Sequence, residues 1–317
     1  MPLDPDLEGF LELAELGRLS GKQQPLHALS VAQARATFAF SSEVLDPSPP
    51  GAVQVSTHAI ECRDGEQLHA RLYRPAGSAE PLPCLLYFHG GGYVVGGLDS
   101  HDSVCRRLAT CSAHAVLAPA YRLAPEQVFP TAVHDAEDSA AWLVRQAAGL
   151  GVDSARISVA GDSAGATLAT VLAIAAARGE LAAGFAPRAQ LLFYPVTDTA
   201  QPRPSHARFA EGYLLESATL EWFYQHYLSE PGQRRDWRAS PLRAQGLPAL
   251  APAYLSLAEY DPLYDEGLAY AAHLRASGTS VTLLTQHGLT HDFLRMSGIT
   301  GQIDGIYSAV GDWLRHL

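Results

Sequence analysis

A serine at residue 163 stands in a pattern that favours nucleophilic catalysis. The residues G-D-S-A-G at 161–165 follow an apolar run, Ile157–Ala160, and open an alanine-rich helical pattern that extends to Ala177. A strand that turns sharply into a helix exposes a serine hydroxyl above the sheet, and small flanking residues allow that turn. The helix dipole favours the negative charge that develops there. We therefore predict Ser163 as a nucleophile, and an ordinary helix-capping serine is the alternative.

A glycine-rich segment is suited to stabilise the oxyanion of acyl transfer. Residues 87–93 read Y-F-H-G-G-G-Y and continue the apolar run Cys84–Phe88. An oxyanion needs backbone N–H groups aimed at it, and glycine lets them approach because it has no side chain. A phosphate loop or a simple flexible turn is the alternative, but the Lys-Ser/Thr ending and the G-x-G-x-x-G pattern of phosphate loops are missing. The predicted oxyanion hole consists of Gly90, Gly91, Gly92 and Ala164, with Gly90 shaping the turn.

The base of a serine triad is expected near the end of the chain, because the order in such folds is Ser, Asp, His. His287 and His291 both follow the apolar run Val281–Leu284, and their spacing alone does not separate them. Two histidines four residues apart would suit zinc on a helix, but Gly288 lies between them and the usual glutamate is missing. We expect no metal site and no cofactor.

The acid of the triad has three candidates. Asp261 comes soon after the apolar run Ala253–Leu257, and Asp198 follows the preceding run in a similar way. Asp265 lies about one helical turn further on, where a favourable interaction with a helix dipole is the simpler explanation. Position alone leaves Asp261 and Asp198 open.

The order of apolar segments predicts the sheet that must hold these residues. Apolar and polar residues alternate in the segments around Val53 and Leu68, which predicts two antiparallel strands with one solvent-exposed face. Short apolar runs that alternate with helical patterns then predict six parallel strands. The sequence therefore predicts an α/β fold with an eight-stranded, mostly parallel sheet flanked by helices. The six runs are Cys84–Phe88, Ala115–Ala118, Ile157–Ala160, Gln190–Tyr194, Ala253–Leu257 and Val281–Leu284.

Composition excludes several other classes of protein. The chain has 317 residues, 47% of them apolar, which argues against disorder. Its net charge of −11 argues against a nucleic-acid partner, because phosphate would be repelled. The longest apolar run, Ala164–Ala177, is too short for stable membrane insertion. The acidic start shows no secretory pattern, and the four cysteines include no C-x-x-C pair, so we expect free thiols and a cytoplasmic location.

Several motifs in order resemble the hormone-sensitive-lipase-like branch of the α/β hydrolases, which contains many bacterial carboxylesterases (bacterial family IV). The resemblance extends from about residue 52 to residue 317 and implies that Asp261 is the acid and His291 the base. One departure is Ala166, where many relatives carry a second glycine, and we expect it to change packing only. The motifs are H-G-G-G at 89–92, Y-R-L-A-P-E at 121–126, G-D-S-A-G at 161–165, D-P-L at 261–263 and H-D-F at 291–293.

The resemblance also implies a helical cap over the serine. The cap would consist of residues 1–48 and 197–238, and the catalytic core of residues 49–196 and 239–317. The interval between Val196 and Ala253 is long and rich in aromatic residues, which also favours a lid, with an elaborate crossover as the alternative. The expected substrate pocket includes Tyr93, Tyr194, Tyr213 and Leu263.

Together these features predict a serine carboxylesterase that hydrolyses short- to medium-chain acyl esters through an acyl-enzyme. A lactone or amide hydrolase with the same triad, or a ligand-binding homologue without catalysis, is the alternative. The expected partner is a small-molecule ester. The strand at Val281–Leu284 should lie at a sheet edge, which favours a homodimer formed through that strand.

Overall fold

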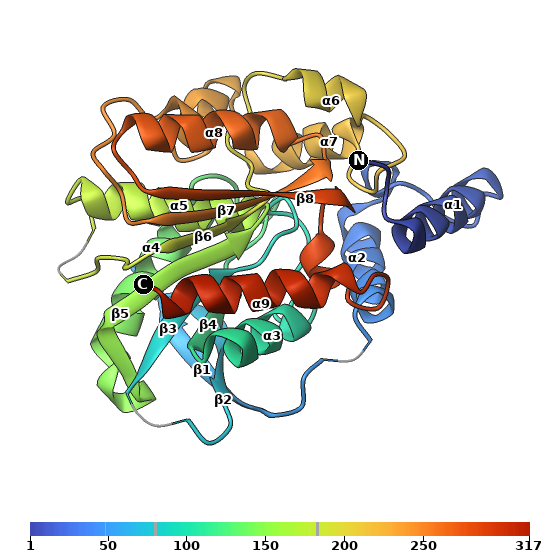
Figure 1. The fold of residues 1–317 in the computed structure, drawn as a ribbon. Coiled ribbons are helices and arrows are strands. Elements are labelled where there is room, and N and C mark those ends of the chain that lie inside the picture. The colour runs from blue at the N-terminus through green and yellow to red at the C-terminus, as the bar shows by residue number, and fades with distance from the viewer. Residues whose placement is uncertain (48, 79–80, 182–183) are drawn as a thin grey trace.

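A single mixed sheet forms the centre of the molecule (Figure 1). The computed structural model describes residues 1–317 except 48, 79–80 and 182–183. Within these residues, eight strands pair in the order β1-β2-β4-β3-β5-β6-β7-β8, which confirms the expected sheet. The strands are β1 (Val53–Glu61), β2 (Gln67–Pro75), β3 (Leu82–Phe88), β4 (Ala115–Pro119), β5 (Val152–Asp162), β6 (Gln190–Phe193), β7 (Ala253–Tyr260) and β8 (Val281–Thr290).

Strand direction differs in one detail from the expectation of two antiparallel and six parallel strands. β1 pairs antiparallel with β2, and β2 pairs antiparallel with β4. The other neighbouring strands pair in parallel. β1 therefore points the same way as the six later strands, and among the described strands only β2 is reversed.

Helices cover both faces of the sheet (Figure 1). α3 and α9 pack together on one face, and α4, α5 and α8 cover the other. The helices are α1 (Pro5–Leu19), α2 (Val31–Leu45), α3 (Asp102–Ser112), α4 (Thr131–Gln146), α5 (Ala164–Ala177), α6 (Pro204–Arg208), α7 (Ser217–Tyr227), α8 (Tyr264–Ala276) and α9 (Gln302–Arg315). Short 3₁₀ turns occur at Leu26–Ala28, Ala148–Leu150, Pro231–Arg235, Pro241–Arg243 and Phe293–Arg295.

The two segments expected to form a cap lie against each other. Arg18 of α1 forms an ion pair with Glu216, which directly precedes α7. His27 Nδ1 lies 3.0 Å from Thr219 Oγ1 of α7. Residues of α1, α2 and α7 also line one cavity with Ser163. The expected boundary at residue 48 lies outside the described residues, and the division into cap and core stays a prediction.

Candidate active site

Ser163 occupies the sharp turn between β5 and α5. Its backbone has φ 52° and ψ −122°, a conformation that L-residues rarely adopt and that stores strain. The turn is tight because a Cβ added to Gly161 would lie 2.4 Å from the carbonyl carbon of Gly165. A Cβ on Gly165 would lie 2.0 Å from the Phe88 carbonyl oxygen of β3. The two glycines of the motif are therefore required by close packing of the helix start on the sheet.

The structure brings Ser163, His291 and Asp261 into one hydrogen-bonded chain. His291 Nε2 lies 2.9 Å from Ser163 Oγ, and His291 Nδ1 lies 2.7 Å from Asp261 Oδ2. The other oxygen of Asp261 accepts the Leu263 N–H at 2.9 Å. All three side chains are buried. This geometry allows the imidazole to take a proton from the serine while the carboxylate orients it.

The pKa of His291 is set by burial and by nearby carboxylates. Burial of the ring disfavours the imidazolium, but the charge of Asp261 and its hydrogen bond outweigh this, so the pKa of His291 is raised. The ring of Tyr194 contacts the imidazole, with ring centroids 4.5 Å apart. A raised pKa makes the imidazole a stronger acceptor for the serine proton.

The other candidates for base and acid have partners elsewhere. His287 lies inside β8, not on a loop after it, because the strand continues to Thr290, and its Nδ1 lies 3.1 Å from Glu259. Asp198 forms an ion pair with Arg243 (2.8 Å). Asp265 accepts a hydrogen bond from the backbone N–H of Ser205 (2.8 Å). None of these three contacts involves Ser163.

The glycine loop after β3 lies beside the nucleophile. Gly90 donates its N–H to Asp162 Oδ1 at 2.9 Å, so it shapes the turn. Gly91 has φ 119°, and a Cβ there would lie 2.2 Å from the Val95 carbonyl oxygen. Gly92 has φ 59°, and a Cβ there would lie 2.2 Å from the ring of Phe223 in α7. Both positions therefore require glycine, for backbone conformation and for space.

Asp162, which sequence reasoning treated only as part of the motif, supports this loop. Its buried carboxylate accepts hydrogen bonds from Tyr87 Oη and from the Gly90 N–H, and His101 Nε2 lies 3.4 Å away. Burial alone would raise the pKa of Asp162, but the interaction with His101 and the hydrogen bond from Tyr87 outweigh it and lower the pKa to about 2. Asp162 is therefore a carboxylate that ties the glycine loop to the serine turn. The aspartate inside G-D-S-A-G was the only sequence signal for this role.

A cavity of about 840 Å³ opens onto the serine. Ser163, His291, Gly91 and Gly92 line it together with side chains of α1, α2 and α7. Of the four expected pocket residues, Tyr93 and Tyr213 line the cavity. The described cavity lining does not include Tyr194 or Leu263. The Tyr194 ring instead packs against His291, and Leu263 directly precedes α8. Residues of α1 and α2, which belong to the segment expected as cap, also line the cavity. None of them was named as a pocket residue from the sequence, because this segment has no recognisable motif.

Across the residues that the structure describes, no group of three or more His, Cys, Asp or Glu side chains is arranged to hold a metal ion. None of the described helices combines the length and the apolar composition that a membrane span requires. The four cysteines are free thiols, as expected.

A family model described as α/β hydrolase fold matches residues 85–295. The chain belongs to the α/β-hydrolase fold family. Ethyl acetate hydrolase of Pseudomonas putida is 48% identical over 321 residues, and the match covers 100% of each chain. The carboxylic ester hydrolase LipN of Mycobacterium tuberculosis is 41% identical over 80% of this chain and 68% of that protein. A hyperthermophilic esterase of the archaeon Pyrobaculum calidifontis has a TM-score of 0.91 at 38% identity, covering 100% of this α/β hydrolase and 99% of that chain.

These relatives confirm two of the expectations from the sequence. The hormone-sensitive-lipase-like branch is confirmed as the family, and carboxylic ester hydrolase is confirmed as the class of enzyme.

Proposed function

We propose that this protein is a serine carboxylesterase that hydrolyses short- to medium-chain acyl esters through an acyl-enzyme. The observation that carries the proposal is the hydrogen-bonded chain from Ser163 Oγ through His291 to Asp261, open to a cavity. A serine hydroxyl is a weak nucleophile unless an adjacent base removes its proton. The distances of 2.9 and 2.7 Å fit such a base and its orienting acid.

In the first half of the reaction, His291 takes the Ser163 proton while Oγ attacks the ester carbonyl carbon. The carbonyl oxygen becomes an oxyanion, which the N–H groups of Gly91, Gly92 and Ala164 stabilise. The bond to the alcohol oxygen then breaks, and His291 returns its proton to that oxygen. Asp261 stabilises the imidazolium in between.

In the second half, a water molecule replaces the alcohol. His291 takes a proton from the water, whose oxygen attacks the acyl carbon on Ser163. The tetrahedral intermediate collapses, the carboxylic acid leaves and Ser163 regains its proton from His291. Apart from the ester and one water molecule, these steps use only residues of the chain, and the same residues act in both halves.

The cavity supports small apolar acyl groups as substrates. Val196, Leu220 and Phe223 line it, and the ring of Phe223 lies against Gly92 of the glycine loop. Apolar side chains favour burial of methyl and methylene groups by about 0.8 kcal/mol for each CH₂. The limited space beside Phe223 favours short and medium chains over long ones.

The decisive test replaces Ser163. Ser163→Ala should reduce hydrolysis of p-nitrophenyl butyrate by several orders of magnitude, and the protein should no longer label with a fluorophosphonate. Ser139→Ala is the matched control, because Ser139 is also a buried serine but its hydroxyl bonds Asp135 on α4. Near wild-type turnover by Ser163→Ala would refute the proposal. If the wild-type protein bound an ester but neither hydrolysed it nor reacted with the fluorophosphonate, it would instead be a ligand-binding homologue.

A homodimer is part of the same proposal. β8 ends the described sheet on one side, and residues 281–286 of this strand are all partly exposed. An edge strand offers unpaired backbone groups to a second copy. Light scattering at micromolar protein should give about twice the monomer mass of 33.9 kDa. A monomer mass at that concentration would reject the dimer.

A further inference from the structure

The segment that carries Asp261 is a tight turn. The Tyr264 N–H donates to the Asp261 carbonyl oxygen at 3.1 Å, which closes a four-residue turn. Pro262 occupies the second position, and Leu263 at the third has φ −83° and ψ 0°. These are the values and the residue preference of a type I turn. The central peptide of this turn joins Pro262 to Leu263.

This central peptide is held on both sides. Its N–H, from Leu263, donates to Asp261 Oδ1 at 2.9 Å. Its carbonyl oxygen, from Pro262, accepts the Ser205 hydroxyl at 2.6 Å. Type I and type II turns differ mainly by a reversal of this peptide plane. A reversed plane would remove the Leu263 N–H from Asp261 and free the carboxylate to turn away from His291.

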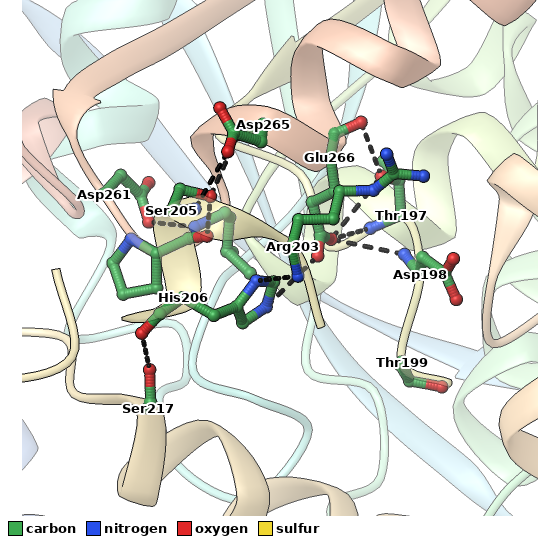
Figure 2. Close-up of polar contacts among 12 residues, drawn as sticks. Thr197, Asp198, Thr199, Arg203, Ser205, His206, Ser217, Asp261, Asp265 and Glu266 are labelled. Carbon is green, nitrogen blue, oxygen red and sulfur yellow. Dashed lines mark hydrogen bonds and ion pairs between the residues drawn. The ribbon is translucent and has the colours of Figure 1, made fainter. Parts of the chain in front are cut away.

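Ser205 itself is fixed firmly enough to hold that plane. It is fully buried at the start of α6, in the interval between β6 and β7. Its backbone N–H donates to Asp265 Oδ2 at 2.8 Å, and its hydroxyl oxygen accepts the Asp265 N–H at 3.2 Å. Figure 2 shows Ser205 beside Asp261 and Asp265, with His206 and Glu266 next to them. One serine therefore makes three hydrogen bonds to residues 262–265.

The next residue anchors α6 to a second part of the core. His206 Nδ1 accepts the Arg203 N–H at 3.0 Å, so the ring proton of the neutral form lies on Nε2. That Nε2 faces Glu266 Oε2 at 3.5 Å. The other oxygen of Glu266 accepts the N–H groups of Thr197 (2.6 Å) and Asp198 (3.2 Å), which follow β6. Two successive residues of α6, Ser205 and His206, therefore contact the start of α8.

We propose that Ser205 is a positioning residue for Asp261: its hydroxyl fixes the central peptide of the turn and keeps the carboxylate directed at His291. The inference rests on the proposed function only in that Asp261 and His291 are taken to act in catalysis. The hydroxyl and the N–H of Ser205 form hydrogen bonds with Pro262 and Asp265 and not with these two side chains, so Ser205 acts through the Pro262–Leu263 peptide. It thereby links the interval that contains α6 and α7 to the catalytic acid.

The test compares two serines of the same region. Ser205→Ala removes the hydroxyl from Pro262, whereas Ser217→Ala removes an equally short bond, from Ser217 Oγ to the His206 carbonyl oxygen (2.6 Å), that does not reach the turn. The pKa of His291 is measured by NMR titration of histidine-labelled protein, and kcat and KM are measured across pH with p-nitrophenyl butyrate. The NMR titration needs no turnover, so its result stands even if Ser163→Ala shows the esterase proposal to be wrong.

A loosened Asp261 stabilises the imidazolium less. Ser205→Ala should therefore lower the pKa of His291 by about half a unit or more. It should also reduce kcat about 10-fold with KM within about twofold, since small misplacements of catalytic groups affect mainly the chemical step. Ser217→Ala should leave the His291 pKa and kcat near wild type. An unchanged His291 pKa in folded Ser205→Ala, or an equal fall in Ser217→Ala, would overturn the inference.

A second pair of variants keeps the test decisive if Ser205→Ala fails to fold. Asp265→Asn retains an oxygen that can accept the Ser205 N–H, while Asp265→Ala does not. Both variants lose the same charge, so any difference between them reports the hydrogen bond. Asp265→Ala should show the lower His291 pKa and kcat, with Asp265→Asn closer to wild type. Equal values for the two would contradict a role for the contact with Ser205.

Discussion

Ser163 Oγ and His291 Nε2 lie 2.9 Å apart although 128 positions separate the two residues along the chain. Ser163 follows β5, His291 follows β8, and Asp261 comes just after β7. These strands run parallel, so their carboxyl ends meet at one edge of the sheet, where active sites of such folds occur. The sheet is therefore what brings the serine and the imidazole within hydrogen-bond distance.

Loss of the Asp261 charge should strongly reduce the turnover of ester substrates. Asp261→Asn keeps the size of the side chain but no longer holds the imidazole in the required tautomer, so kcat should fall on the order of 10⁴-fold. Asp198→Asn is the control, because Asp198 is also buried and paired, but with Arg243. It should stay within about tenfold of wild type. Steady-state kinetics with p-nitrophenyl butyrate checks both, and an equal loss in the two variants would show that the assignment of the acid is wrong.

The pH dependence of kcat/KM should report His291. The protonated imidazole cannot accept the Ser163 proton, so kcat/KM falls as pH is lowered through the pKa of His291 in the free enzyme. Because that pKa is raised, the acid limb should lie above pH 6.5, the ordinary value for histidine. Rate measurements from pH 5 to 9 locate the limb. A limb below pH 6.5 would mean that Asp261 does not stabilise the imidazolium.

Phe223 should restrict acyl length. Its ring packs on Gly92 and lines the cavity, so Phe223→Ala creates space next to the glycine loop. Each methylene that enters this space gains about 0.8 kcal/mol, so the ratio of kcat/KM for octanoyl over butyryl esters should rise about 10-fold or more. The neighbouring Trp222→Ala is the control, because Trp222 is absent from the described cavity lining. A chain-length series tests this, and an unchanged ratio in Phe223→Ala would exclude the role.

Glu266 should make stability sensitive to alkaline pH. Burial raises the pKa of Glu266 from 4.5 to about 8, with the Thr197 and Asp198 N–H groups opposing the shift. A raised pKa in the folded state means that this stability is fully present below pH 4.5 and is lost as pH rises through about 8. The free energy of unfolding should therefore fall by a few kcal/mol between pH 6 and pH 9.5.

Glu266→Gln removes this ionisation, and urea titrations at the two pH values should show a smaller fall than in wild type. Glu221→Gln serves as the control, because its pKa is lowered by Arg234 and it does not titrate in this range. The same fall in Glu266→Gln as in wild type would show that Glu266 is not the titrating group.

Much of the fold was predictable because its signals are local. Apolar runs of strand length, such as Ile157–Ala160, identify buried strands, and the G-D-S-A-G motif identifies the turn that follows. The glycines at 90–92 were recognisable for the same reason, since a φ of 59° at Gly92 is a local requirement for glycine, and their role at an oxyanion stays a prediction. The direction of β1 was not predictable from the sequence, because pairing between distant segments decides it.

The sequence by itself determined the order of elements, the family and the residues suited to hydrolysis. Only the tertiary structure decided which side chains meet. In the folded chain His287 contacts Glu259, whereas His291 contacts Ser163. Ser205 lies against the peptide that follows Asp261. Local patterns fix backbone conformation over a few residues, whereas these contacts join segments that only the packed sheet and its helices bring together. The motifs therefore indicate which reaction the residues suit, whereas the distances between those residues depend on how the whole chain packs.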